Sequence, residues 1–353
     1  MGKILIYGAG AVGQYLGGLL TRAGRHSVTM VGRSEHYSVI RSKGLNIITP
    51  SGKEFIHKPD FLPMLERIPQ DVVFDWIFLT VKSYDLKKAI AELKRIIDRN
   101  RNVKFLLFQR GVGSHELLKG LIPDDRIYLA AQTINVAILE FGTVVQTNQA
   151  GAVCIAPLKL RNDLHDALDL FSGSGIETLD FKDWKSMKWS SLLYEMLTDG
   201  LCALSDYKPD RLFSYGLLVK METDAFREGV KVVTKLGLDI INLPAYNVKN
   251  MVFLSSLPDF IGKVFIKKEL LSPKNVRVST IKNDMGKAKH NSEIPYINGA
   301  ISRWGKEWGV KTPVNDFISS ELMKIVTGKL SWEVYRHKPD EIFACFKIFK
   351  LNH

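Results

Sequence analysis

The stretch Lys3-Ile4-Leu5-Ile6-Tyr7-Gly8-Ala9-Gly10-Ala11-Val12-Gly13 decides the fold of the N-terminal part of this chain. Its first five residues form an apolar, β-rich run that leads directly into a G-x-G-x-x-G loop. Residues 11–23 then have the apolar spacing of a helix, and a second β-rich run follows at 27–31. The order strand, glycine loop, helix, strand predicts a dinucleotide-binding unit.

The loop glycines have separate roles in such a unit. Gly8 permits the tight turn, Gly10 lets the backbone approach a pyrophosphate, and Gly13 allows the helix to pack closely on the strand. The helix N-terminus offers its N–H groups to the phosphates. The cofactor-binding residues expected in the loop are Gly8, Ala9, Gly10, Ala11, Val12 and Gly13.

The end of the second strand indicates which dinucleotide binds. An acidic residue there would bond the ribose 2′-hydroxyl, whereas a basic residue would accept a 2′-phosphate. This chain has Arg33, and Glu35 comes two residues later, where it better begins a helix. NADP(H) is therefore the expected cofactor. A solvated surface arginine is the other interpretation of Arg33.

Lys82 follows the long apolar run at 73–81. Ligands of open α/β sheets bind at the carboxyl ends of the strands, so Lys82 is a second candidate for an anion of the cofactor. The alternative is a surface lysine whose ammonium group extends into solvent.

The rest of the chain divides into two patterns. Up to residue 180, β-rich runs alternate with helical segments, which predicts a Rossmann-like, doubly wound parallel sheet with helices on both faces. From residue 181 strands become scarce and helices dominate. We therefore predict an NADP-binding α/β domain at 1–180 and an all-α substrate and dimerisation domain at 181–353. The expected strands are 3–7, 27–31, 73–81, 103–108, 127–132, 143–147 and 151–156, and the expected helices are 11–23, 84–98, 115–121, 184–205, 215–236, 246–254, 275–288 and 293–308.

Composition narrows the class of protein. The formal net charge is +12, but no run of five or six like charges occurs, which argues against a nucleic-acid partner. The three cysteines form no C-x-x-C pair and the eight histidines no H-x-x-x-H spacing, so we expect neither disulfides nor a metal site. No apolar stretch reaches the roughly 18 residues of a membrane span, and the chain starts on a strand without a signal-peptide pattern. A cytoplasmic protein with a small-molecule substrate is expected, with a homodimer allowed.

These motifs, taken together, resemble the ketopantoate reductase (2-dehydropantoate 2-reductase) family over nearly the whole chain. The resemblance implies a Rossmann domain followed by an all-α domain of the 6-phosphogluconate dehydrogenase C-terminal type, and reduction of a 2-oxo acid with NADPH. It also implies that Glu293 contacts the cofactor ribose and that Thr280 lies against the substrate. The matching segments are GAGAVG at 8–13, VGR at 31–33, TVK at 80–82, RGVG at 110–113, 189–204 and EIPYING at 293–299.

Several positions depart from the family pattern. Arg110 stands where the family has an asparagine beside the nicotinamide. In the helix expected at 184–205, Ser191 replaces the proton-donating lysine, and Glu195 and Asp199 replace two substrate-binding asparagines. Their i, i+4, i+8 spacing places all three on one face of a helix. Two carboxylates there would repel a 2-oxo acid.

Three compensations are conceivable. Lys188, one turn before Ser191, could supply the proton, but a surface lysine that begins an amphipathic helix is the favoured interpretation, because lysines are rarely buried unpaired. Arg110 could pair with Glu195, or a carboxyl with a raised pKa could be the acid. The sequence thus predicts catalytic roles for Lys188, Ser191 and Arg110 and substrate binding by Glu195, Asp199 and Thr280.

Three functions follow from this arrangement. The first is an NADP-dependent reductase of a carbonyl or imine other than ketopantoate, with a positive group that Glu195 and Asp199 could hold. The second, of another class, is an inactive NADP-binding sensor or assembly protein, suggested by the missing lysine. The third is ketopantoate reduction through a substitute donor.

Overall fold

The computed structural model describes residues 2–160, 164–271, 279–285 and 290–352, and it divides into two compact units. The first contains Met1–Gln109 and Ser114–Met187, and the second contains Arg110–Gly113 and Lys188–His353. The short segment Arg110–Gly113 therefore packs with the helical unit, although it follows a strand of the first. Among the described residues no helix has the length and apolarity needed to cross a membrane.

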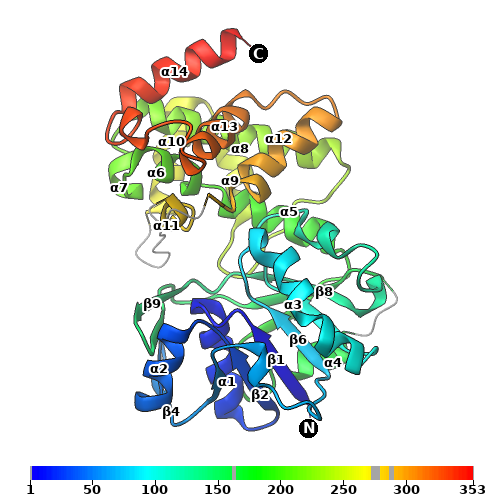
Figure 1. Ribbon diagram of the computed structural model, residues 1–353. Coiled ribbons are helices and arrows are strands. Elements are labelled where there is room, and N and C mark those ends of the chain that lie inside the picture. The colour runs from blue at the N-terminus through cyan, green and yellow to red at the C-terminus, as the bar shows by residue number, and fades with distance from the viewer. Residues whose placement is uncertain (1, 161–163, 272–278, 286–289, 353) are drawn as a thin grey trace. The chain divides into compact units, whose positions relative to one another are not determined.

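The first unit is built on an eight-stranded sheet (Figure 1). Most neighbours are parallel, as expected, but β8 and β11 pair antiparallel, so the sheet is mixed. In spatial order its strands are β12 (Thr178–Asp180), β11 (Val153–Pro157), β8 (Ile127–Gln132), β7 (Lys104–Leu107), β6 (Trp76–Leu79), β1 (Lys3–Tyr7), β2 (Ser27–Val31) and β5 (Asp60–Leu62).

A second, four-stranded sheet belongs to the same unit. The sequence predicted only one of its strands, 143–147, and assigned that strand to the main sheet, which is wrong. Its strands are β4 (Gly52–Ile56), β3 (Leu45–Thr49), β10 (Thr143–Gln146) and β9 (Val136–Glu140), in that order. The helices of this unit are α1 (Ala11–Ala23), α2 (Ser34–Lys43), α3 (Leu86–Arg99) and α4 (His165–Asp169), with short 3₁₀ turns at Leu65–Arg67, Ser83–Asp85, Ser114–Leu118 and Asp124–Arg126.

Helix α1 contacts strands of both sheets, which explains why it is buried on more than one face. Gly17 and Gly18 make this possible. A Cβ atom on Gly17 would lie 2.3 Å from the sulfur of Met30 in the main sheet, and one on Gly18 would lie 2.4 Å from Cδ1 of Ile47 in the second sheet. The second sheet thus covers a helix that a simple doubly wound fold would leave facing solvent.

The second unit is helical, and α5 enters it at Lys188. The helix expected at 184–205 is broken at residues 196–198 and forms two helices. The expected helix at 115–121 is only a 3₁₀ turn, and half of the residues 275–288 lie outside the described residues. The helices are α5 (Trp184–Glu195), α6 (Asp199–Ser205), α7 (Pro209–Leu212), α8 (Gly216–Lys235), α9 (Val248–Ser256), α10 (Asp259–Leu270), α11 (Lys282–Met285), α12 (Asn298–Glu307), α13 (Pro313–Val326) and α14 (Pro339–Leu351), with 3₁₀ turns at Ile294–Tyr296 and Trp332–Val334.

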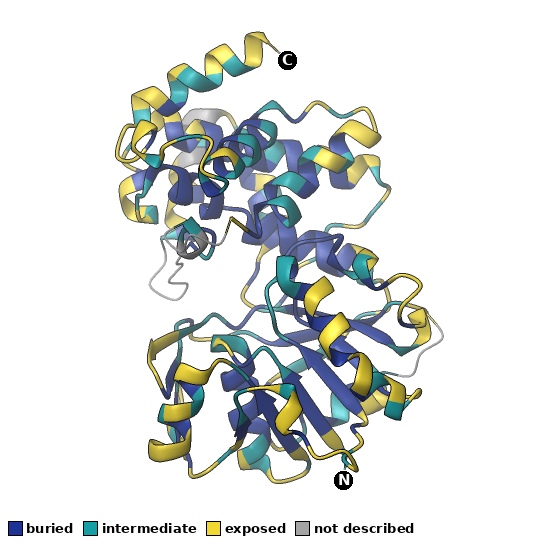
Figure 2. Ribbon diagram, viewed as in Figure 1, coloured by how far each residue is buried: buried dark blue, intermediate teal, exposed yellow. Residues whose placement is uncertain are grey.

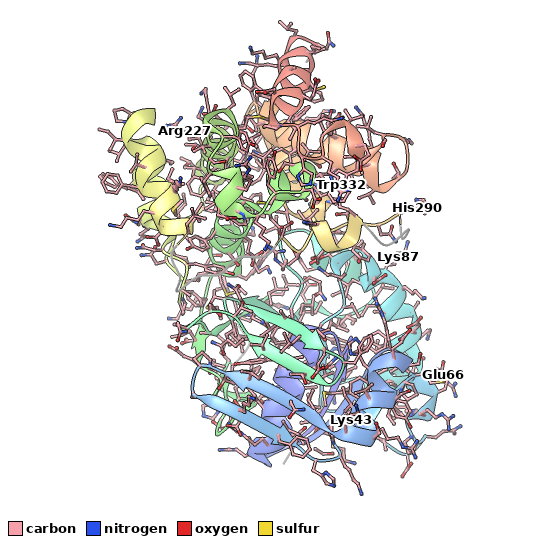
Figure 3. The ribbon with its side chains drawn as sticks, turned by 90° about the vertical axis from the view of Figure 1, so that its left-hand side faces the viewer. Lys43, Glu66, Lys87, Arg227, His290 and Trp332 are labelled. Carbon is pink, nitrogen blue, oxygen red and sulfur yellow. The ribbon has the colours of Figure 1, made fainter. Side chains whose placement is uncertain are left out.

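Each unit has its own core, seen as dark blue segments in Figure 2. In the helical unit, α8 supplies two buried polar anchors. Arg227, labelled in Figure 3, donates from Nε to the carbonyl of Ser255 at 2.7 Å. Glu228 accepts the N–H groups of Val314 and Asn315, both at 3.0 Å, at the start of α13. A carboxylate at this place satisfies N–H groups that a helix cannot pair internally.

The carboxyl of Glu228 should make the stability of the protein depend on pH. Burial raises its pKa to about 7, against the opposing effect of its N–H donors. The folded protein then binds this proton more tightly than the unfolded chain does. The contribution of Glu228 to the free energy of unfolding is therefore fully present below about pH 4.5 and is lost as the pH rises through 7. We expect Glu228→Gln to remove this pH dependence, which is at most about 3 kcal/mol.

Urea unfolding followed by tryptophan fluorescence between pH 5 and 8 measures the effect. Glu333→Gln, an exposed position, is the control and should keep the wild-type slope. An unchanged pH slope in Glu228→Gln would contradict the assignment.

Candidate active site

The glycine loop lies between β1 and α1 in the predicted place, and its shape follows from close contacts. Gly8 has a φ of +107°, and a Cβ atom there would lie 2.6 Å from the nitrogen of Val81. A Cβ atom on Gly13 would lie 2.7 Å from the carbonyl oxygen of Gly8. At Gly10 the nearest atom would be 3.9 Å away, so the backbone is open to a ligand at this position. The loop therefore fits the pyrophosphate of a dinucleotide.

Backbone hydrogen bonds fix the loop to the neighbouring strands. The N–H groups of Gly8 and Ala9 both donate to the carbonyl of Val31, at 3.0 and 2.9 Å. The Thr80 hydroxyl donates to the Gly8 carbonyl at 2.9 Å. Thr80 was part of the matching TVK segment but was not predicted as a site residue, because its contact with residue 8 depends on the pairing of β6 with β1.

Arg33 and Glu35 lie at the start of α2. Arg33 is exposed and precedes the first residue of the helix, and Glu35 is in the first turn, as predicted. Gln14 and His36 were missed by the sequence analysis: Gln14 Nε2 donates to the Ala9 carbonyl at 2.8 Å and lies 3.0 Å from His36 Nδ1. This buried pair joins the glycine loop to α2.

Lys82 lies three residues beyond the end of β6 and is half-buried. It immediately precedes a 3₁₀ turn at Ser83–Asp85. Its place after a parallel strand agrees with the expected position, while its contact with a cofactor stays a prediction.

Arg110 is the centre of the polar cluster in the helical unit. Its Nη1 lies 2.8 Å from Asp199 Oδ2 and also donates to the Thr280 hydroxyl. Its Nε lies 3.5 Å from Glu195 Oε2, and its Nη2 donates to the Glu195 carbonyl at 3.4 Å. The pairing of Arg110 with Glu195, one of the three conceivable compensations, is present, and the shorter ion pair is with Asp199.

Asp199 is buried, with 5% of its side chain exposed, and its carboxylate accepts several hydrogen bonds. The Ser279 hydroxyl donates to its Oδ1 at 2.6 Å, and the N–H of Ile281 donates to the same oxygen at 3.3 Å. Burial would raise the pKa of Asp199, but the charge of Arg110 and these hydrogen bonds hold it below its ordinary value. Asp199 is therefore a carboxylate at neutral pH.

Glu195 joins two other parts of the cluster. Its Oε1 accepts a hydrogen bond of 2.7 Å from the Ser191 hydroxyl, one turn earlier on α5. Its Oε2 accepts one of 3.4 Å from the N–H of Gly111. Ser191 and Glu195 thus share one helix face as predicted, whereas Asp199 begins a new helix and reaches the group through Arg110.

The break between α5 and α6 depends on Thr198. Its φ of +69° is unusual for a β-branched residue, and its N–H donates to Glu222 Oε1 at 2.6 Å. Glu222 is buried on α8, 24 residues further along the chain. The sequence offered no local signal for this break, because its partner lies on another helix.

Lys188 is buried, with 6% of its surface exposed, so the surface-lysine interpretation is wrong. Burial lowers the pKa of its ammonium group below the ordinary value, with Arg110 acting in the same direction and Glu195 and Glu293 opposing. Glu293 is itself buried, and its charge also helps to raise the pKa of Arg110 above the ordinary value against the effect of burial. Lys188, Arg110, Glu195 and Glu293 thus form one electrostatically connected group.

The segment Arg110–Gly113 fits tightly against the EIPYING segment. A Cβ atom on Gly111, whose φ is +68°, would lie 1.9 Å from the carbonyl oxygen of Tyr296. The N–H of Val112 donates to the same carbonyl at 3.1 Å. Glycine is therefore required at residue 111, and this contact brings two of the sequence motifs together.

The glycine loop between a parallel strand and a helix is the feature of a dinucleotide-binding protein. The model of the family described as "Ketopantoate reductase PanE/ApbA" matches residues 4–159, and that of its C-terminal domain matches residues 183–326. The chain belongs to the ketopantoate reductase family, whose members are NAD(P)-dependent oxidoreductases.

Individual relatives agree with this membership. The 2-dehydropantoate 2-reductase of Aquifex aeolicus is 26% identical over 320 residues, which cover 90% of this chain and 94% of the relative. The 2-dehydropantoate 2-reductase of Pyrococcus abyssi is 25% identical over 315 residues, which cover 89% of this chain and 94% of the relative. Among solved structures, D-mandelate dehydrogenase with NADH and anilino(oxo)acetate is 23% identical, and the match covers 93% of this chain and 98% of that one. The TM-score of 0.75 shows that the two chains have the same fold.

Within the described ranges, no group of three or more His, Cys, Asp or Glu side chains could hold a metal ion. The polar cluster of the helical unit combines carboxylates with Arg110 and Lys188, and such a donor set favours proton and charge chemistry.

Asp199→Asn should destabilise the helical unit by about 3 kcal/mol, because it removes a partner of the partly buried Arg110 charge. Since the pKa of Asp199 is lowered on folding, its contribution is present above about pH 3.8 and disappears as the pH falls further. Urea unfolding at pH 7 measures the loss.

Asp224→Asn is the matched control. Asp224 pairs with Lys220 and Arg227 but is 30% exposed, so we expect a loss of no more than about 1 kcal/mol. Equal losses of unfolding free energy in the two variants would contradict the larger contribution expected of the Arg110–Asp199 pair.

Proposed function

We propose that the protein is an NADP-dependent reductase that transfers hydride to a carbonyl (2-oxo acid-like) or imine substrate other than ketopantoate, with Lys188 as the proton donor. The observation that carries this proposal is the burial of Lys188 beside the charges of Glu195, Glu293 and Arg110. A buried ammonium group with a lowered pKa is suited to general acid catalysis near neutral pH.

The cofactor is assigned to the residues that the sequence motifs singled out. The backbone of residues 8–13 would hold the pyrophosphate at the N-terminus of α1. Arg33, exposed at the start of α2, would pair with the 2′-phosphate, and Lys82 would add a positive charge. The family resemblance assigns the cofactor ribose to Glu293. Reduced NADP would supply the hydride for the carbonyl or imine carbon.

The protein side of the reaction is proton delivery. As the substrate carbon accepts hydride, negative charge develops on the carbonyl oxygen, and Lys188 would stabilise that charge and give its proton to the oxygen. The product is an alcohol, or an amine from an imine, and Lys188 takes a new proton from solvent. Ser191 and Arg110 would position Glu195 beside this lysine, as their hydrogen bond and ion pair suggest.

The charges around the site bear on the substrate. Glu195, Asp199 and Thr280 are the substrate-binding candidates, but Asp199 and Thr280 are both engaged by Arg110. This lowers the support for a cationic substrate, because the carboxylates are already paired. Arg110, Glu195 and Asp199 are ionic residues at positions where the family resemblance expects amides, and Ser191 stands where it expects a lysine. These differences still argue for a substrate other than ketopantoate.

The direct test is NADPH oxidation at 340 nm against a panel of 2-oxo acids, ketones and imines that includes ketopantoate. For the substrate that is turned over, Lys188→Met should lower kcat by about 10²–10⁴-fold while NADPH binding is retained. The wild-type kcat should fall as the pH rises through the pKa of Lys188, which lies below its ordinary value of 10.5. Lys185→Met, at an exposed position on α5, should leave kcat unchanged.

Other outcomes separate the alternatives. Tight NADPH binding without turnover of any compound would support the inactive sensor or assembly protein. Prompt turnover of ketopantoate would refute the substrate assignment. A large gain in ketopantoate reduction by Ser191→Lys would show that only the lysine of the family pattern was missing.

A second prediction concerns the choice of dinucleotide. Arg33→Ala should weaken NADPH binding at least about tenfold and leave NADH binding nearly unchanged, because only NADPH carries the 2′-phosphate. Fluorescence titration with each dinucleotide measures both affinities. Arg41→Ala, on an exposed turn of α2, is the control. Tighter binding of NADH than NADPH by the wild type would refute the preference; D-mandelate dehydrogenase was solved with NADH.

The cytoplasmic location expected from the sequence stays a prediction.

A further inference from the structure

The C-terminal helix α14 has far more apolar surface than the molecule covers. Its sequence, PDEIFACFKIFKL, is rich in large apolar residues, yet Ile342 is its one buried residue. Leu351 is 86% exposed and Ile348 is 61% exposed. Figure 2 shows most of the helix in the colours of intermediate and exposed residues. Neighbouring exposed apolar side chains of this size mark a contact surface.

One face of α14 is anchored to the helical unit. The rings of Phe346 and Phe349 pack against Phe317 of α13 at centroid distances of 5.5 and 5.6 Å. Just before α14, Trp332, labelled in Figure 3, donates from Nε1 to the carbonyls of Ala203 and Leu204, both at 3.0 Å. The helix is therefore held in place, and its outer face is not needed for this attachment.

The outer face has a regular pattern. Asp340, Ala344, Lys347 and Leu351 follow one another at spacings of four, three and four residues, which place them on one seam of the helix. Ile348 lies beside this seam. Along it, the carboxylate of Asp340 and the ammonium group of Lys347 enclose the small Ala344, and the large apolar Leu351 follows Lys347.

Helix α14 also lies outside the residues that the two family models match. The C-terminal family model ends at residue 326, and α14 begins at Pro339. A groove of about 500 Å³, lined by both apolar and polar side chains, lies between α13 and α14. The groove is lined by Phe317, Ser320, Glu321, Lys324, Tyr335, Cys345, Ile348, Phe349 and Asn352.

We propose that this face of α14 binds the same face of a second copy, antiparallel about a two-fold axis near Ala344. In this arrangement Asp340 faces the partner's Lys347 and Lys347 faces the partner's Asp340, so two ion pairs form across the axis. A parallel arrangement would put like charges together. The small side chain of Ala344 lets the helices approach closely, and Ile348 and Leu351 are covered by the partner.

The charge pattern favours this occupant over an anionic membrane. A membrane surface would attract Lys347 but repel Asp340 and Glu341 in the first turn of the same helix. A two-fold pair satisfies both signs with one sequence, as closed homodimers do. Because the seam is short, we expect a dimer that forms over the micromolar range of concentration.

Sedimentation velocity of the full-length protein over that range tests the proposal. The wild type should shift from monomer to dimer, and Ile348→Asp and Leu351→Asp should each raise the dissociation constant at least about tenfold. Both positions are exposed in one copy, so folding, checked by the melting temperature, should be unaffected. Leu160→Asp, at a position 77% exposed in the first unit, is the matched control and should dimerise as the wild type does.

Charge reversal tests the antiparallel geometry. Asp340→Lys and Lys347→Glu should each weaken the dimer at low ionic strength, because each places like charges opposite one another. An equimolar mixture of the two variants should restore a dimer, since one copy is then positive and the other negative along the seam. Effects of these charges within a single helix cannot give this rescue.

Two results would overturn the proposal. One is a dimer that persists in both aspartate variants, which would place the interface elsewhere. The other is a wild type that stays monomeric throughout, whether or not it binds phosphatidylserine vesicles; vesicle binding would assign the face to a membrane.

Discussion

The ion pairs of Arg110 with Asp199 and Glu195 are the interaction on which the polar cluster depends. They join the segment Arg110–Gly113, the end of α5, the start of α6 and residues 279–281. Without this cation, two carboxylates would be left in partly desolvated surroundings, which costs several kcal/mol per charge. Residues 110, 195 and 199, where the sequence analysis expects departures from the family pattern, are therefore best understood as one linked group.

The same cluster gives Lys188 its properties. A buried ammonium group is unfavourable, and its pKa falls until nearby negative charges compensate. Here Glu195 and Glu293 oppose burial only in part, so the pKa stays below the ordinary value. The amine is thereby kept close to the point at which it can release a proton. Under the proposed function, catalysis and stability would be linked at this place, because Glu195 and Arg110, which surround Lys188, also hold α5 and α6 together.

The sequence predicted the parts of the molecule that depend on local rules. The glycine loop follows from the positive φ of Gly8 and the close approach of the backbone at Gly13, both of which the spacing of the glycines indicates. The break at Thr198 and the burial of Lys188 were missed, because they depend on Glu222, Glu293 and Arg110, which are distant in sequence. The small sheet was missed for a similar reason: its strands β3 and β10 pair across almost 100 residues.

The most direct measurement of the central claim is the titration of Lys188 itself. Protein labelled at lysine with ¹³Cε can be followed by NMR over a range of pH, with Lys188→Arg used to assign the signal. The account predicts that the Lys188 amine titrates below 10.5, apart from the surface lysines. A Lys188 signal that titrates at or above 10.5 would contradict it.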